Sequence, residues 1–174
     1  QRTVTGAGAA WVTRKGPGPR IAGCTVGTVK DYGIKDANNM GAAMAPAALA
    51  TIQRHMSDLN KTPSDYDMII TGDLGIHGRS VLLNIAEQKG IHLKNILVDC
   101  GALIFDPKTQ DVHSGGSGCG CSAVTLCGYL LEKLKRGDLG NILFCGTGAL
   151  LSPTSTQQGK SIPGVCHAIS ITGG

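Results

Sequence analysis

The stretch Val112-His-Ser-Gly-Gly-Ser-Gly-Cys-Gly-Cys-Ser122 separates an apolar segment from a run of regularly spaced leucines. Leu126, Leu130 and Leu134 recur with helical spacing, and Ser122 is a suitable N-cap for that helix. The helix is expected to end at Gly137. A glycine-rich turn between a strand region and a helix start is typical of an α/β protein.

Outward from this turn, apolar strand-like runs alternate with helical stripes. Ala45, Leu49, Ile52, Met56 and Leu59 predict a helix with Pro46 in its first turn, preceded by an exposed loop over residues 30–44. Val81, Leu82, Ile85 and Ala86 predict a second helix that stops at Gly90. The strands are expected at 4–12, 21–29, 66–71, 96–105 (one or two strands), 141–145 and 165–171.

This order predicts an α/β fold with a mostly parallel or mixed five-stranded sheet and helices on both faces. At 174 residues, with 41% apolar and 16% charged residues, the chain can bury a substantial core. It opens without Met and stops directly after a strand-like segment, so we expect a piece of a longer protein. No run of 18 apolar residues and no signal peptide occurs, which favours an intracellular protein.

The net charge of +4 does not favour nucleic acid as a partner. The densest basic run, Lys133-Leu-Lys-Arg136, lies where a helix C-terminus is expected, and cations complement the helix dipole there. Aromatic residues, on which bases stack, make up only 3% of the chain.

Seven cysteines, an odd number, lie mostly in apolar runs such as those of Cys24, Cys127, Cys145 and Cys166. This pattern favours buried thiols in a reducing compartment. The Cys119-Gly-Cys121 pair lacks the further ligands of a zinc site. A nucleophilic Cys119 at a helix N-terminus remains an alternative to simple packing.

The glycine-rich stretch is the strongest candidate site. Successive backbone N–H groups at a helix N-terminus can bind an anion or carboxylate. The stretch is neither a Walker A loop nor a dinucleotide fingerprint, and a close-packed turn is the alternative. The candidate ligand-binding residues are His113, Ser114, Gly116, Ser117, Cys119 and, at the end of a predicted strand, Asp73.

Other places for the site are the Asp73 and Asn38-Asn39 regions. Among the remaining histidines, we expect His55 on the exposed side of the first helix and His77 in a loop. His92 is expected in a turn and His167 in the last strand.

Several stretches together resemble the stage V sporulation protein AD family, a group similar to thiolases and ketoacyl synthases. The similarity covers essentially the whole chain. The stretches are Thr3-Val-Thr-Gly-Ala-Gly-Ala9, Gly33-Ile-Lys-Asp-Ala-Asn-Asn-Met-Gly-Ala-Ala-Met-Ala-Pro46, Thr71-Gly-Asp-Leu-Gly75, Asp111-Val-His-Ser-Gly-Gly-Ser-Gly-Cys-Gly-Cys-Ser-Ala123 and Gly148-Ala-Leu-Leu-Ser-Pro-Thr-Ser155.

The resemblance implies the C-terminal half of a duplicated thiolase-like fold. Residues 1–18 would be the last strand and linker of the N-terminal half, and residues 19–174 the C-terminal half. It further implies a protein that binds dipicolinic acid (pyridine-2,6-dicarboxylate), free or as its calcium chelate, and supports its uptake into the developing spore. Other proteins of the same operon, some of them in the membrane, would be partners of a homodimer peripheral to the inner spore membrane.

Departures from the enzymes imply that catalysis is lost. Gly72 and Gly116 stand near positions where the enzymes have catalytic His or Asn, and glycine has no side chain to transfer a proton. Cys145 lies near the second active-site Cys of thiolases but is expected to be structural. We therefore expect no enzyme activity, no cofactor and no metal. An acyl-transfer enzyme using Cys119 or Cys145, and a scaffold without ligand, are the alternatives.

Overall fold

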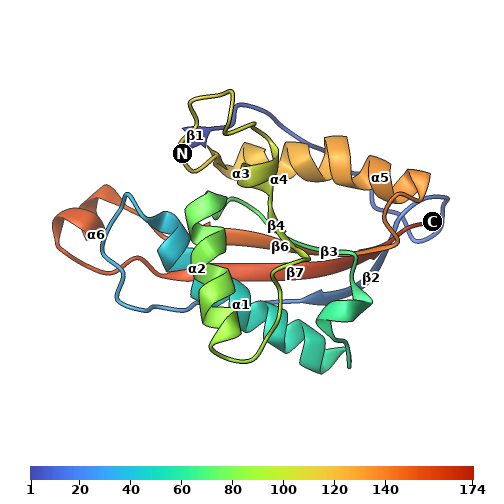
Figure 1. Ribbon diagram of the computed structural model, residues 1–174, viewed down its shortest axis with the longest axis horizontal. Helices are drawn as coiled ribbons and strands as arrows, with labels where there is room; N and C mark the ends of the chain where they lie inside the picture. Colours follow the sequence, from blue (N-terminus) through green and yellow to red (C-terminus); the bar gives the residue numbers. More distant parts are fainter.

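The centre of the molecule is a mixed five-stranded sheet (Figure 1), seen in a computed structural model that describes residues 1–174. Its strands follow the order β2-β7-β6-β3-β4. β3 is parallel to β4 and β6, whereas β7 is antiparallel to β6 and β2. The α/β fold and the five-stranded sheet are confirmed. The strands are β2 (Arg20–Thr25), β3 (Met68–Thr71), β4 (Leu97–Asp99), β6 (Asn141–Ala149) and β7 (Gly164–Thr172).

Helices cover both faces of the sheet (Figure 1), as expected. α1 (Met40–Asp58) and α2 (Gly75–Glu87) pack on one face and bury Leu49, Ile52 and Leu82. The other face carries one continuous helix made of α4 (Cys119–Thr125), the π-helical turn η2 (Leu126–Leu130) and α5 (Leu131–Arg136). Leu130 and Leu134 of this helix are fully buried. Shorter helices are η1 (Pro63–Asp65), α3 (Cys100–Leu103) and α6 (Pro153–Gln157).

The first predicted strand is wrong, because none of residues 4–12 belongs to a strand. Only β1 (Arg2–Thr3) is a strand, and it pairs in parallel with β5 (Gly116–Ser117) in a separate two-stranded sheet. After Val4, whose N–H donates to Ser117 O (2.9 Å), the chain runs along α4 instead. Gly8 lies directly against the backbone of Ala123. Residues 5–12 are nevertheless exposed, and Trp11 and Val12 keep 92% and 74% of their surface accessible.

α1 begins at Met40, five residues earlier than predicted. Asn39 is its N-cap, and its side chain accepts a hydrogen bond from Ala42 N (3.2 Å). Pro46 consequently lies in the helix interior, where its missing N–H removes one intrahelical hydrogen bond. The predicted stripe is confirmed for Leu49, Ile52 and Met56, which are buried. The predicted 15-residue loop shortens accordingly.

Other boundaries also differ from the predictions, since β2 ends at Thr25 rather than at residue 29 and β6 continues to Ala149 rather than ending at residue 145. The third helix begins after Gly118 rather than Ser122, although it ends as expected at Gly137, whose φ of 80° is left-handed. The second helix starts at Gly75, so His77 is helical and not in a loop. The strand predicted over 96–105 ends at Asp99, because the side chain of Asp99 caps α3.

His55 is fully buried, contrary to the expected exposure. Its Nδ1 lies 2.8 Å from Thr25 Oγ1 on β2, and its Nε2 has no partner. Burial lowers the pKa of this imidazole, so the neutral form is favoured.

All seven cysteines are free thiols, of which four are buried, two are exposed and Cys127 is half-buried. Cys100, Cys121, Cys145 and Cys166 are fully buried. Cys24 and Cys119 are exposed, contrary to the expectation of burial, because Cys24 lies on the edge strand β2 and Cys119 opens α4.

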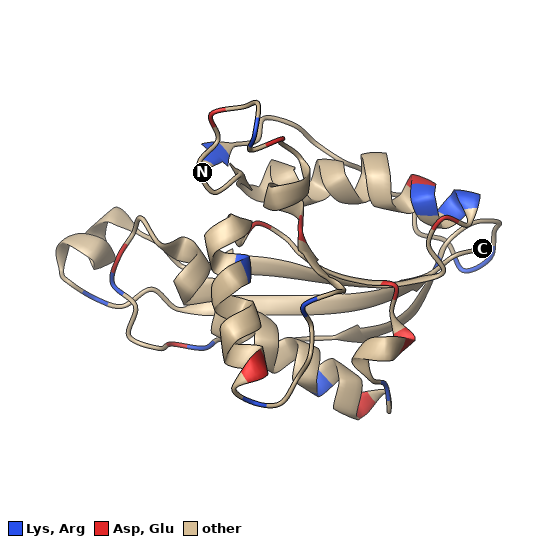
Figure 2. Cartoon of the chain, viewed as in Figure 1, with Lys and Arg blue, Asp and Glu red and all other residues tan.

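Lysines and arginines are spread over the molecule, and the last turn of α5 contains the densest group (Figure 2). Lys133 of this group pairs with Asp138 at 3.6 Å. No helix in the structure combines the length and the apolar character needed to cross a bilayer.

Candidate functional site

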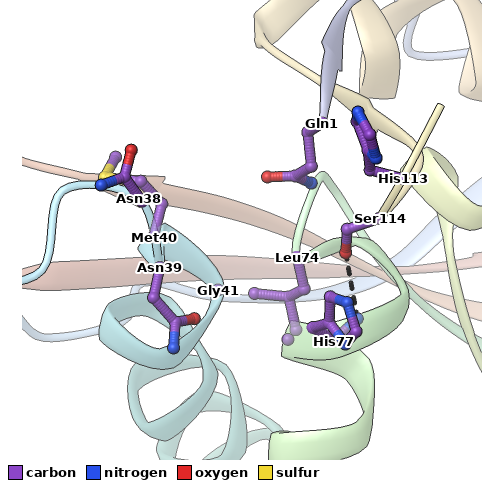
Figure 3. Close-up of a pocket in the computed structure, with 10 residues that line it drawn as sticks. Gln1, Asn38, Asn39, Met40, Gly41, Leu74, His77, His113 and Ser114 are labelled. Carbon is purple, nitrogen blue, oxygen red and sulfur yellow. Dashed lines mark hydrogen bonds between the residues drawn. The ribbon is translucent and has the colours of Figure 1, made fainter.

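A polar cavity of about 330 Å³ lies where the N-termini of α1 and α2 approach the start of the chain (Figure 3). Two histidines, three side-chain amides and a serine hydroxyl form most of its polar lining, and only two lining residues are hydrophobic. It is lined by Gln1, Asn38, Asn39, Met40, Gly41, Leu74, His77, Gly78, His113 and Ser114. We call it the α1–α2 cavity.

The α1 side of the cavity offers unused donors. A helix leaves its first N–H groups without intrahelical acceptors. In α1, Asn39 accepts the hydrogen bond from Ala42 N, whereas the N–H groups of Met40 and Gly41 have no backbone acceptor. Both residues line the cavity together with Asn38. The positive end of this 19-residue helix dipole therefore faces a polar space.

The α2 side is different, because protein groups already occupy the donors of its first turn. The N–H groups of Leu74 and Gly75 donate to the Asp99 carboxylate at 2.9 and 2.8 Å. The N–H of Ile76 donates to Ser114 O (2.8 Å), and that of His77 donates to Ser114 Oγ (3.1 Å). Ser114 therefore joins the glycine-rich stretch to α2.

Asp99 is the anchor beneath the cavity. Its carboxylate is fully buried and also accepts hydrogen bonds from Thr71 Oγ1 (2.7 Å) and Gly101 N (2.9 Å). Burial raises the pKa of Asp99, and the hydrogen bonds from Thr71, Gly75 and Leu74 oppose that rise. One buried side chain thus fixes the starts of α2 and α3 together.

The glycines of the central stretch serve close packing. A Cβ on Gly115 would collide with the carbonyl of Gly101, and Gly115 has a positive φ of 99°. A Cβ on Gly116 would lie 2.7 Å from Val4 and 2.9 Å from Ile104. Its backbone donors are also partly taken, since Gly115 N donates to Val112 O. These contacts agree with the close-packed turn that the sequence left as an alternative.

Asp73 belongs to a second group of polar residues beside the cavity, the Asp73 cluster. Its carboxylate accepts hydrogen bonds from Gly118 N and from Thr147 Oγ1, both at 3.1 Å. A protein carboxylate therefore already lies at the N-terminus of α4, where the sequence suggested an external anion. Gly72 adjoins this cluster, and a Cβ there would come within 2.9 Å of Thr147 Oγ1.

The structure brings only part of the predicted site together. His113 and Ser114 line the α1–α2 cavity, along with the Asn38-Asn39 region that the sequence offered as another location. Gly116, Ser117, Cys119 and Asp73 do not line it. Sequence reasoning missed Gln1 and His77. The available signal for His77 was its position in the first turn of a helix that follows a buried parallel strand.

Gln1 closes the cavity on the side of the glycine-rich stretch. Its Nε2 donates to Asp73 O (3.2 Å) and Gly116 O (3.0 Å), and Figure 3 shows its side-chain oxygen directed toward the α1 side. The structure contains no group of three or more His, Cys, Asp or Glu side chains that could hold a metal ion.

A family model and a curated relative both match almost the whole chain. The family model described as stage V sporulation protein AD matches residues 1–172. The stage V sporulation protein AD of Bacillus subtilis (strain 168) is 44% identical over 167 residues, which is 96% of this chain and 49% of that protein. The chain thus spans about half the length of this relative.

The solved structures that resemble the chain are thiolase-like enzymes. The tetronic acid condensing enzyme AbyA1 has a TM-score of 0.51 at 12% identity, over 89% of this chain and 47% of that one. The acetyl-CoA acetyltransferase of Bacillus anthracis has a TM-score of 0.46 at 16% identity, over 90% and 31% of the respective chains. At these identities the likeness to AbyA1 supports the fold alone.

Proposed function

The chain belongs to the stage V sporulation protein AD family, and we propose that its α1–α2 cavity binds dipicolinic acid without transforming it. In this proposal the whole protein supports uptake of the dianion into the developing spore. Membrane proteins of the same operon and a second copy of the protein would be its partners, at the inner spore membrane.

The chemistry of the cavity lining is the observation that supports this proposal. A rigid aromatic dicarboxylate needs donors on two sides, and charge-assisted hydrogen bonds to carboxylates are stronger than neutral ones. Asn38 and the open N–H groups of Met40 and Gly41 lie on one side, and His113 and Ser114 on the other. A volume of about 330 Å³ falls at the small end of ligand pockets, which suits a single-ring molecule.

The same proposal states that the protein does not catalyse acyl transfer. Gly72 and Gly116, near the positions implied for catalytic side chains, offer none, and Thr147 occupies the space in front of Gly72. Cys145, the candidate second thiol, is fully buried, and its contact with Cys166 and its burial raise its pKa. A thiol that stays protonated is a poor nucleophile.

Calorimetric titration of the full-length protein with dipicolinate tests binding, with carboxylate-free pyridine as the control ligand. We expect heat of binding for dipicolinate alone. Equal heats for both ligands, or none, would contradict the proposal. Condensation or thiolysis of acyl thioesters above background would instead support the acyl-transfer alternative.

A matched pair of variants locates the ligand. Asn38→Ala removes a donor from the cavity and is expected to weaken binding about 10-fold or more, the usual range for a hydrogen bond to a charged group. Ser117→Ala changes the glycine-rich stretch outside the cavity and is expected to leave the affinity within about twofold. The opposite ranking would place the ligand against the glycine-rich stretch.

A further inference from the structure

The α1–α2 cavity has no fixed charge in its lining. None of its ten lining residues is Lys, Arg, Asp or Glu, and His77 and His113 are its only titratable side chains. His77 comes from the first turn of α2 and His113 from the glycine-rich stretch. In Figure 3 the two imidazoles lie on either side of Ser114, along the same wall of the cavity.

A dianion in such a cavity requires positive charge from somewhere. The open N–H groups of α1 contribute partial charge only, equivalent to about half an elementary charge at a helix N-terminus. Histidine is the side chain whose charge ordinarily changes between pH 5 and 8. We infer that His77 and His113 supply the missing charge, so that the cavity takes up protons when it binds a dicarboxylate. This inference rests on the proposed function and adds proton-linked control to it.

The neighbouring charges agree with this role. Asp111 Oδ1 lies 3.8 Å from His113 Nε2, and Arg2 lies 3.4 Å from Asp111 Oδ2. On the α1 side Asp36 accepts a hydrogen bond from Asn38 N. Beneath α2 the carboxylates of Asp99 and Asp73 are held by protein donors. Arg79 of α2 donates to Leu97 O.

The carboxylates of the ligand do not change their charge in the pH range where histidine does. Carboxylic acids are ionised above about pH 5, so between pH 6 and pH 8 changes in affinity report on the protein. Each proton taken up makes the affinity rise as the pH falls. We expect dipicolinate to bind the full-length protein roughly tenfold more tightly at pH 6 than at pH 8. This is the effect expected from about one added positive charge on the histidines.

The experiment is calorimetric titration with dipicolinate at pH 6, 7 and 8, in buffers with different heats of ionisation. The buffer dependence of the heat gives the number of protons taken up. Replacing both imidazoles with neutral amides, His77→Gln and His113→Gln, is expected to abolish the uptake and flatten the pH profile. His92→Gln is the matched control, since His92 is an exposed histidine outside the cavity, 3.2 Å from Glu87.

The outcomes separate the two proposals. Binding that is independent of pH, or a pH profile that persists unchanged in the double variant, overturns the role of the histidines and leaves dipicolinate binding intact. No binding at any of the three pH values overturns the proposed function itself. Both substituted side chains are exposed, and circular dichroism of each single variant checks that the fold is retained.

Discussion

Asp99 has no cation beside it, although its carboxylate is fully buried and accepts hydrogen bonds from one hydroxyl and three backbone N–H groups. A buried carboxylate without such donors would be very costly. Its surroundings therefore explain why a charged residue occurs at the end of an apolar strand. Of the two helix starts that it joins, that of α2 contributes Leu74, His77 and Gly78 to the cavity wall.

Replacing Asp99 with Asn is expected to destabilise the protein by about 1–3 kcal/mol. The amide retains one acceptor oxygen, so at least one buried backbone N–H loses its partner, and an unsatisfied buried donor costs about this much. Urea denaturation measures the change in the free energy of unfolding. The matched control is Asp58→Asn, which removes only an exposed i,i+4 pair with Arg54 at 3.3 Å. Equal losses in both variants would contradict the anchoring role of Asp99.

For single residues, the sequence identified several polar residues of interest but not the groups that they contact. Asp73 and His113 were recognised as polar residues next to glycines, but spacing does not show which carboxylate faces a helix and which faces a ligand. His55 was misplaced for a related reason. Its partner, Thr25 on β2, is 30 residues away in the sequence, and helical periodicity carries no information about such a contact.

Among the elements, α1 and α2 approach each other most closely at two glycines. A Cβ on Gly41 would lie 2.7 Å from the Cα of Gly78, and a Cβ on Gly78 would lie 2.7 Å from the Cα of Gly41. Real Cβ atoms do not approach other atoms so closely, so any side chain there moves a helix. Both glycines line the cavity, and the crossing of the two helices thus determines its width.

Gly78→Ala is expected to lower the stability by about 1–3 kcal/mol, because the added methyl group overpacks the contact between the helices. Gly128→Ala in η2 is a matched control, since a Cβ there meets nothing within 4 Å. Alanine in that open helical position is expected to leave the stability unchanged or raise it by up to about 1 kcal/mol. Thermal unfolding of both variants measures the difference, and a neutral Gly78→Ala would contradict the tight crossing.

The elements were predictable where large apolar residues repeat. Leu49, Ile52 and Met56 identified α1, and Leu130 and Leu134 identified the long helix on the other face. The first turn of α1 was missed because Gly41 has a low helix propensity and Ala43, although a good helix former, is too small to mark an apolar stripe. The strand predicted at 4–12 failed because apolar composition alone does not show that a segment is buried or paired, and Trp11 and Val12 are largely exposed.

For the molecule as a whole, the sheet separates two apolar clusters. Ile52 and Ile69 belong to the cluster under α1 and α2. Ile142 belongs to the cluster under the long helix formed by α4, η2 and α5. Alternation along β3 sends Ile69 to one face and Ile70 to the other. The same strands contribute side chains to both clusters, but each cluster lies on its own face of the sheet.

Mutations in the two clusters are therefore expected to add. Ile52→Val and Ile142→Val should each cost about 0.5–1.5 kcal/mol. The double variant should equal their sum within about 0.5 kcal/mol, since distant sites without shared partners are independent. Ile52→Val with Ile69→Val, inside one cluster, is the comparison pair. A coupling above about 1 kcal/mol across the sheet, measured by urea denaturation, would show that the two layers are not separate.

The burial of four thiols determines the order in which the cysteines are expected to oxidise. Burial raises the pKa of Cys121 to about 12, so at pH 7 only about one molecule in 10⁵ presents a thiolate there. Burial likewise raises the pKa of Cys100. Oxidants attack the thiolate, and each step up the oxidation series starts from it. Oxidation is therefore expected first at the exposed thiols of Cys24 and Cys119. The buried thiols should stay reduced for as long as the protein is folded.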